Sequence, residues 1–300
     1  MAVQRVHAWL FASGDHAGAP GRAPVVTTPL RAADVDVVWE PFAGFQRRAM
    51  AANADELFLG GAKGCGKGDV LTAQHLRYVD VPEYAGLFLR QTYQELLRQI
   101  DRAHVFYGRL SADRRPAWSG ATQRFTWSSR AFVQYGHCRI PADVQKYQGG
   151  NWGRISYDEL GNNAFAAKIA DLLISELRFP DARVRRQFAA SGNPGFAGHG
   201  ACKVRYIVPC GKQGERLAWS RLVLPSGEVR HWSRQFVPGT VRDNPIYYNY
   251  STYMAQLMLL PVDKDHPGPR ALGIASARLV EHLGDDGVGR FAHARPHALA

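Results

Sequence analysis

The chain has 300 residues, enough for one large domain or two small ones, and its 46% hydrophobic and 21% charged residues are typical of a soluble globular protein with a sizeable core. Its formal net charge of +11 favours nucleic acid or an anionic surface as a partner, although a merely soluble basic protein would carry the same charge. No run approaches the roughly eighteen apolar residues of a membrane span, which argues against a membrane anchor. The four cysteines lie far apart without C-x-x-C spacing, which argues against a zinc site and a disulfide framework and favours a reduced cytosolic setting.

The first 38 residues are rich in Ala, Gly, Pro and Arg and show little periodicity, which predicts a loose N-terminal arm that does not carry the function. Residues 39–50 form an aromatic-rich turn that leads into a predicted helix. Gln46 lies on this helix, just upstream of a short apolar run, where a side-chain amide can pair with the N6 and N7 atoms of adenine. Gln46 is therefore the candidate adenine ligand, and a solvent-facing helical glutamine is the alternative.

A glycine-rich loop at residues 60–67 connects the apolar run of residues 57–59 to a segment with the apolar spacing of a helix, residues 67–78. Strand, phosphate loop and helix follow in this order in nucleotide-binding α/β folds, and the spacing from Gly61 to Lys67 fits them. Glycines let backbone N–H groups approach phosphate oxygens, and the Lys67 ammonium can reach the β and γ phosphates. A glycine-rich turn with a surface lysine is the alternative interpretation.

The residue after the loop lysine is Gly68, where such loops ordinarily carry a Ser or Thr hydroxyl that binds Mg²⁺. The match to a phosphate loop therefore lacks its metal ligand and needs support from other parts of the chain.

A second buried strand is predicted at residues 86–90, followed by a helix at residues 92–107. Arg90 ends this strand on the side where ligands of an open α/β sheet gather, so it is a candidate contact for a nucleotide or substrate phosphate, with an ordinary ion pair as the alternative. Residues 124–127 and 131–136 predict a hairpin that extends one edge of the sheet. The candidate ATP-binding residues are Gln46, Gly61, Ala62, Gly64, Cys65, Gly66, Lys67, Gly68, Asp69 and Arg90.

Two adjacent carboxylates, Asp158 and Glu159, end a β-prone run at residues 153–157. This arrangement suits hydrolysis of a nucleoside triphosphate, because the aspartate can hold Mg²⁺ while the glutamate polarises the attacking water. We assign Asp158 to the metal and Glu159 to the base. Carboxylates that cap a helix or face solvent are the alternative, and the position after a strand and downstream of the loop favours the catalytic assignment.

A third strand is predicted at residues 187–190 and ends in small and polar residues, of which Ser191 or Asn193 could sense the γ-phosphate or position water. The sequence Asn193-Pro194-Gly195 is equally good turn chemistry.

Further β segments are predicted at residues 203–208, 217–224 and 230–237. Basic and aromatic residues alternate along them, which could place cations toward a DNA backbone, although alternation is first of all a feature of half-buried strands.

Taken together, these elements resemble the ATPase domain of phage large terminase subunits, the motors that drive double-stranded DNA into empty proheads. The resemblance covers about residues 40–260 and depends on seven landmarks in the family's order. They are Gln46, Gly-Gly-Ala-Lys-Gly-Cys-Gly-Lys at 60–67, Leu-Arg-Gln-Thr-Tyr-Gln-Glu-Leu at 89–96, Asp-Val-Gln-Lys-Tyr-Gln-Gly at 143–149, Tyr-Asp-Glu-Leu at 157–160, Ser-Gly-Asn-Pro-Gly with Gly198-His199 at 191–199, and Val-Arg-Asp-Asn-Pro at 241–245.

The resemblance implies a P-loop NTPase fold with a mainly parallel central sheet flanked by helices, plus a β-hairpin-rich C-terminal extension. It implies ATP and Mg²⁺ as cofactors, double-stranded DNA, the portal protein and a small terminase subunit as partners, and a ring of identical subunits on the prohead portal in the host cytoplasm. The residues implied in this way are Lys67 as the phosphate lysine, Lys63 as a second catalytic lysine inside the loop, Glu159 as the catalytic carboxylate, and Ser191, Gly192 and Asn193 as the coupling motif.

Two departures from the family pattern qualify this expectation. Because Gly68 lacks a hydroxyl, water, Asp158 or Asp69 would have to complete the Mg²⁺ site, and turnover is expected to be weak or absent without that compensation. Complete large terminases also carry a C-terminal nuclease domain that binds two metals, whereas the tail at residues 261–300, about forty residues, is too short to build one.

The expected organisation is therefore an arm at residues 1–38, a terminase-like ATPase domain at 39–260 and a low-complexity, disordered tail at 261–300, with the nuclease domain absent. Two alternatives stay open. One is another P-loop DNA-dependent ATPase, such as a helicase-like enzyme, and the other is a truncated terminase remnant that binds nucleotide or DNA without turnover.

Overall fold

The structure, a computed structural model, describes residues 38–61, 63–249 and 251–258. The predicted N-terminal arm, apart from Val38, the tail at 261–300 and the candidate residue Ala62 lie outside the described residues. The strands are β1 (Glu56–Gly61), β2 (Ala85–Arg90), β3 (Ala117–Ser119), β4 (Arg124–Thr126), β5 (Phe132–His137), β6 (Arg154–Tyr157), β7 (Gln187–Ser191), β8 (Ala218–Val223) and β9 (Val229–Gly239).

The helices are α2 (Phe45–Ala51), α3 (Lys67–His75), α4 (Tyr93–Tyr107), α5 (Ala166–Ile174), α6 (His199–Cys202), α7 (Val208–Cys210), α8 (Pro245–Tyr248) and α9 (Ser251–Met258). Short 3₁₀ helices cover Leu76–Tyr78, Pro141–Tyr147, Leu160–Asn162 and Val241–Asp243, and a π-helical stretch covers Lys203–Ile207. None of the helices in the described part of the chain has the length and apolar character that crossing a membrane requires.

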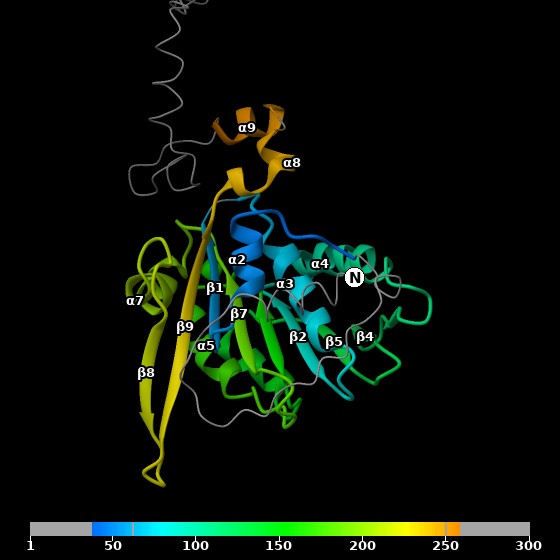
Figure 1. The fold of residues 1–300 in the computed structure, drawn as a ribbon, viewed down its shortest axis with the longest axis vertical. Helices are drawn as coiled ribbons and strands as arrows, with labels where there is room; N and C mark the ends of the chain where they lie inside the picture. The colour runs from blue at the N-terminus through cyan, green and yellow to red at the C-terminus, as the bar shows by residue number, and fades with distance from the viewer. Residues whose placement is uncertain (1–37, 62, 250, 259–300) are drawn as a thin grey trace, which may run out of the picture.

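The described strands form one nine-stranded sheet in the order β3-β4-β5-β2-β6-β7-β1-β9-β8 (Figure 1). Strands β5, β2, β6, β7, β1 and β9 run parallel, and the outer strands β3, β4 and β8 pair antiparallel. The predicted α/β class with a mainly parallel sheet is confirmed.

The central strands are buried on both faces, which explains why they are short continuous apolar runs instead of alternating patterns. Every residue of β6 and β7 is buried, and only the last residue of β1 and of β2 is partly exposed. Helices on both faces provide this cover. The connections from β1 to β2 and from β2 to β5 run in one direction along the sheet, and the connection from β6 to β7 runs in the other. Because connections between parallel strands are right-handed, α3 and α4 lie on one face of the sheet and α5 lies on the opposite face.

Helix α4 begins as the sequence predicts. The Thr92 hydroxyl accepts a hydrogen bond from the Glu95 N–H, and the Glu95 carboxylate accepts one from the Thr92 N–H, which is the reciprocal cap of a helix N-terminus. The buried residues Leu96, Ile100, Ala103, Phe106 and Tyr107 follow at helical spacing. The helix predicted at residues 92–107 is confirmed.

The hairpin predicted at residues 124–127 and 131–136 is present, and the β segments predicted at residues 217–224 and 230–237 pair with each other as a second hairpin. The β4–β5 pair extends one edge of the sheet, with β3 added outside it. The β8–β9 pair forms the other edge, with β9 pairing parallel to β1, and its turn extends beyond the other strands (Figure 1).

The β segment predicted at residues 203–208 is wrong, because this stretch is helical from His199 to Cys210. The prediction followed the β-branched residues Val204, Ile207 and Val208, but burial follows a helical period instead of strict alternation. Tyr206 is fully buried, whereas Val204 and Val208 are 72% and 60% exposed.

Two contacts attach this helical stretch to the sheet. The ring of Tyr206 stacks on Phe58 of β1 with centroids 4.8 Å apart, and Arg205 Nε lies 2.6 Å from a carboxylate oxygen of the fully buried Glu56. Tertiary packing therefore overrides the local β propensity of the segment.

Substitution along this stretch distinguishes a helix from a strand, because residues 204, 206 and 208 would share one face of a strand. We expect Tyr206→Ala to lower the free energy of unfolding by about 3 kcal/mol, since it removes a buried aromatic ring. Val204→Ala, at an exposed position, should cost less than about 0.5 kcal/mol. Urea denaturation measures both, and similar losses at the two positions would contradict the helical assignment.

Candidate nucleotide site

The glycine-rich loop, the coupling residues and the paired carboxylates follow three neighbouring strands. β7 lies between β1 and β6 and is parallel to both. Because the carboxyl ends of parallel strands lie at one edge of the sheet, the segments that follow β1, β7 and β6 meet there, and β2 brings Arg90 to the same edge.

The loop after β1 uses glycines where other residues do not fit. Gly61 has a φ of +104°, and a Cβ at this position would collide with the carbonyl oxygen of Gly239 in β9. Gly66 has a φ of +87°, and a Cβ there would collide with the Gln46 amide. Both positions therefore require glycine for backbone conformation and for space.

Lys67 is buried, with 8% of the residue exposed, so the surface-lysine alternative is wrong. Its ammonium donates a hydrogen bond of 2.8 Å to Asn193 Oδ1 and lies 3.5 Å from the Gly61 carbonyl oxygen. The loop lysine and the predicted coupling motif are thus in direct contact. Lys63, by contrast, is exposed in the loop.

Gln46 is almost fully buried, which excludes the solvent-facing alternative. Its Oε1 accepts a hydrogen bond from the Phe42 N–H at 2.9 Å, and its Nε2 donates to the Cys65 carbonyl oxygen at 3.1 Å. The amide therefore holds the inside of the phosphate loop, and adenine recognition by Gln46 stays a prediction.

Asp158 is buried at the end of β6, so the alternative of a solvent-facing carboxylate is wrong for this residue. Its Oδ1 accepts a hydrogen bond of 2.6 Å from Ser191 Oγ. Its Oδ2 accepts hydrogen bonds from Arg90 Nη2 at 2.7 Å and from Gln99 Nε2 at 3.0 Å. The carboxylate thus links the ends of β2, β6 and β7.

Glu159 has a left-handed backbone conformation, with a φ of 61°, that directs the chain out of β6 into the following 3₁₀ turn. Its backbone N–H donates to Ser191 Oγ at 2.8 Å, and its Oε2 accepts from Asn162 Nδ2 at 3.0 Å. Burial raises the pKa of Glu159 above its ordinary value of 4.5; the Arg90 guanidinium opposes this shift and the Asp158 carboxylate adds to it. A carboxylate whose pKa is raised in this way suits a general base.

Arg90 is engaged by both carboxylates, as the ion-pair alternative expected. Its Nη2 lies 2.7 Å from Asp158 and 3.2 Å from Glu159, and only 12% of its side chain is exposed. Burial disfavours its charge, but the two carboxylates outweigh this effect and raise the pKa of Arg90. A phosphate contact by Arg90 stays a prediction.

Asp69 and Cys65 of the candidate set are both occupied by protein contacts. The Asp69 carboxylate accepts two hydrogen bonds of 2.7 Å from Arg102. Cys65 is buried in the loop, and burial raises the pKa of its thiol. All four cysteines are free and buried.

Three residues at the site had no role assigned from the sequence. Asn244 Nδ2 donates to the Gly64 carbonyl oxygen at 2.7 Å, and Asp243 Oδ1 accepts from the Phe45 N–H at the start of α2 at 2.9 Å. The segment 241–245 is one of the terminase-like landmarks, so a signal existed for these two. Gln99 is one polar residue among several on α4, and nothing in the sequence singles it out.

Within the described residues, no group of three or more His, Cys, Asp or Glu side chains lies together as a metal site. This fits a nucleotide-bound Mg²⁺, which takes most of its ligands from phosphates and water and only one or two from the protein. Two protein oxygens at the site fit that need, since the buried Asp158 carboxylate lies beside the buried Gln99 Oε1, which has no hydrogen-bond partner among the described residues.

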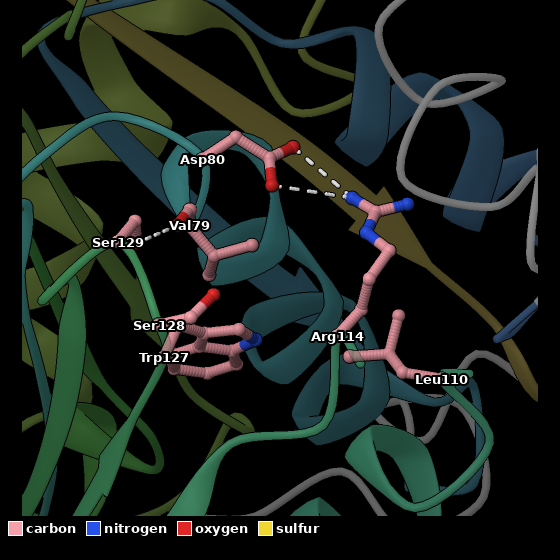
Figure 2. A pocket seen from close by; sticks show the side chains of 7 residues that line it. All are labelled: Val79, Asp80, Leu110, Arg114, Trp127, Ser128 and Ser129. Carbon is pink, nitrogen blue, oxygen red and sulfur yellow. Dashed lines mark hydrogen bonds and ion pairs between the residues drawn. The ribbon is translucent and has the colours of Figure 1, made fainter. Parts of the chain in front are cut away.

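A separate pocket lies beside the 3₁₀ turn after α3 (Figure 2). Its lining includes Arg114, whose guanidinium bridges to Asp80 at 3.1 Å across the opening. Its volume of about 30 Å³ holds no more than one or two water molecules, so it is not a nucleotide site.

The strand order and the site define a class. A glycine-rich loop after one strand, paired carboxylates after a strand two places away in the sheet, and a polar strand end between them make a P-loop NTPase fold. The sequence matches no protein-family model and no curated protein.

Solved structures place the fold more narrowly. The large terminase of a thermophilic bacteriophage has a similar structure, with a TM-score of 0.52 and 15% sequence identity over 76% of this chain and 53% of that one. Another crystal form of the same terminase, in complex with ATP-gamma-S, gives a TM-score of 0.51 at 15% identity over 76% of this chain and 52% of that one. The comparison with the large terminase ATPase domain of Thermus phage P74-26 gives a TM-score of 0.47 and 15% sequence identity over 74% of this chain and 90% of that one.

The chain has the fold of a large terminase ATPase domain, and it spans about half of the thermophilic-phage large terminase that it matches.

Substituting the loop glycine tests the close approach of β1 and β9. In Gly61→Ala the added Cβ collides with the Gly239 carbonyl oxygen, and the alanine must also adopt the positive φ of this position. We therefore expect the free energy of unfolding to fall by about 3 kcal/mol or more. Gly227→Ala is the matched control, because Gly227 has a φ of +83° with open space around it. Gly227→Ala should lower the free energy of unfolding only by the backbone strain of an alanine at positive φ, about 1–2 kcal/mol. Equal losses in chemical denaturation would show that the collision is absent.

Proposed function

We propose that this chain is the ATP-hydrolysing motor domain of a viral DNA-packaging terminase, which moves double-stranded DNA into a prohead. The observation that carries the proposal is a polar cluster at one sheet edge, in which Lys67 of the phosphate loop binds Asn193 of the coupling segment. Ser191 of the same segment binds Asp158, and Arg90 pairs with both Asp158 and Glu159. The terminase fold supports it independently.

ATP would bind with its phosphates against the loop and the N-terminus of α3. Lys67 would contact the β and γ phosphates, and the exposed Lys63 could reach them from the loop. A γ-phosphate that binds the Lys67 ammonium would draw on the group that now donates to Asn193 Oδ1, so the Lys67–Asn193 contact would change with the nucleotide. Loss of the phosphate after hydrolysis therefore changes the contacts of Asn193, which gives the coupling segment Ser191–Gly192–Asn193 its physical basis.

Mg²⁺, when bound with ATP, would neutralise charge on the phosphates, and Asp158 with the neighbouring Gln99 oxygen would hold it. Glu159 would accept a proton from the attacking water at a carboxylate oxygen, and Arg90 fixes that carboxylate in place. Ser191 joins the Asp158 carboxylate to the backbone of Glu159, since its hydroxyl donates to Asp158 Oδ1 and accepts from the Glu159 N–H.

DNA would contact basic side chains away from the nucleotide. The β8–β9 hairpin exposes Arg221, Arg230 and His231, and the chain carries a formal net charge of +11. Such contacts go to phosphates, so binding should be largely independent of sequence and weaken with salt. Processive movement would require several subunits, and we propose a ring on the portal with a small terminase subunit, acting in the host cytoplasm.

ATPase activity of the purified chain with Mg²⁺ and double-stranded DNA tests the proposal. We expect DNA-stimulated turnover that falls at least about 100-fold in both Lys67→Ala and Glu159→Ala, because the first loses phosphate binding and the second loses the base. Lys168→Ala, an exposed lysine on α5, is the control and should keep full activity.

Absence of turnover in the parent chain with ATP binding intact would contradict the motor assignment and leave a terminase remnant that only binds. Turnover that survives Lys67→Ala would show that hydrolysis occurs at another site or comes from a contaminant.

The pH dependence of turnover reports on Glu159. A general base works only when ionised, and the pKa of Glu159 in the free protein is raised above 4.5, so the acid limb of the kcat/KM profile should have its midpoint above pH 4.5. Arg90 lowers this pKa, so Arg90→Gln should move the limb to higher pH. Arg98→Gln, exposed on α4, should leave the profile in place. A limb that moves to lower pH in Arg90→Gln would rule out this coupling.

A further inference from the structure

Gly68 and Gln99 occupy one small space at the start of α3. A Cβ built on Gly68 would lie 2.9 Å from Gln99 Nε2 and 3.1 Å from Gln99 Oε1. The Gln99 amide, which comes from α4, therefore fills the volume that a Ser or Thr side chain at position 68 would take. A side chain at position 68 and the observed position of Gln99 exclude each other.

The two ends of this amide are in different situations. Nε2 donates a hydrogen bond of 3.0 Å to Asp158 Oδ2, whereas Oε1 is buried and has no hydrogen-bond partner within the described residues. Buried carbonyl oxygens are rarely left without a partner, since desolvation without a replacement contact is unfavourable. The unpartnered Oε1 belongs to the same amide that bonds Asp158, the metal-binding carboxylate of the proposed site, and this position indicates that a ligand binds it.

Both carboxylates close to this space have protein partners, and Asp158 accepts hydrogen bonds from Arg90, Gln99 and Ser191. The Asp69 carboxylate receives both Nε and Nη2 of Arg102 at 2.7 Å. Gln99 thus offers an uncommitted oxygen beside Asp158, and amide carbonyls belong to the hard oxygen ligands that Mg²⁺ accepts.

We propose that Gln99 Oε1 is a protein ligand of the nucleotide-bound Mg²⁺ and replaces the hydroxyl that Gly68 lacks. The loss of a ligand at position 68 and the arrival of an amide from α4 are then one change, because the amide needs the space that glycine leaves. This inference rests on the proposed function, since the metal enters with the nucleotide.

Binding of Mn²⁺ as a spectroscopic substitute for Mg²⁺ tests the inference without turnover. Free Mn²⁺ is measured by EPR in the presence of ATPγS, for the parent chain and for Gln99→Met, which keeps an unbranched side chain of similar length and removes the oxygen. We expect Mn²⁺ affinity to fall about 10-fold or more. Gln94→Met, exposed on the same helix, is the control and should not change it.

Restoring the hydroxyl provides the reciprocal test. In the Gln99→Ala background, Gly68→Ser should recover most of the lost Mn²⁺ affinity, because the space is open and the hydroxyl is present. In the parent background, Gly68→Ser should give no gain, since its Cβ meets the Gln99 amide. Equal effects of Gly68→Ser in both backgrounds would overturn the inference.

A measurement on the parent chain removes any dependence on how the variants fold. With ¹³C at the glutamine side-chain carbonyls, electron-nuclear double resonance of the Mn²⁺–ATPγS complex should show a ¹³C coupling that Gln99→Met abolishes. Absence of this coupling, or unchanged Mn²⁺ affinity in Gln99→Met, would overturn the inference about Gln99. The proposed function would still stand in that case, provided that the chain binds ATPγS. A parent chain that fails to bind ATPγS would overturn both.

Discussion

The site depends on the parallel pairing of β7 between β1 and β6. Leu57 and Phe58 of β1 lie opposite Ala189 and Ala190 of β7, which in turn lie opposite Ser156 and Tyr157 of β6. This register places the ends of the three strands side by side, so that Ser191 reaches Asp158 without any further adjustment of the chain. A parallel sheet has no alternation to fix its register, and here burial of every residue of β6 and β7 between two helical layers fixes it instead. The chemistry is therefore positioned by the hydrophobic core.

Charge at this sheet edge is balanced by neighbouring side chains. Two carboxylates and one guanidinium share a partly buried space, and Ser191 and Gln99 supply further hydrogen bonds. The network carries one more carboxylate than guanidinium groups, and the nearby Lys67 supplies a second cation. A buried carboxylate pair is tolerated only with such partners, and removing one of them leaves an uncompensated charge. The charges are therefore interdependent, since the Lys67 ammonium lowers the pKa of Glu159 while its hydrogen bond goes to Asn193.

Much of this site follows from local rules, and the rest depends on contacts between distant segments. Short apolar runs followed by glycine, Asp158 or Ser191 predict buried parallel strands with polar ends, because both features are encoded within a few residues. The strand predicted at residues 203–208 is wrong because valines such as Val204 and Val208 occur in helices as well as in strands. The packing of Tyr206 on Phe58, a contact between distant segments, favours the helix. The segment 241–245 is a landmark of the resemblance, but no local pattern predicts that Asn244 binds Gly64, 180 residues away.

The departure at Gly68 coincides with a contact in the fold that the motif does not include. Read alone, the sequence Gly66-Lys67-Gly68 describes a phosphate loop that has lost its metal ligand. In the fold, the same glycine removes a Cβ at the place where α4 passes the start of α3, and the Gln99 amide enters the gap and bonds to Asp158. A larger residue at position 68 would push this amide away from the carboxylate. The observed position of the Gln99 amide therefore depends on glycine at position 68, a contact that a motif match at this position alone does not detect.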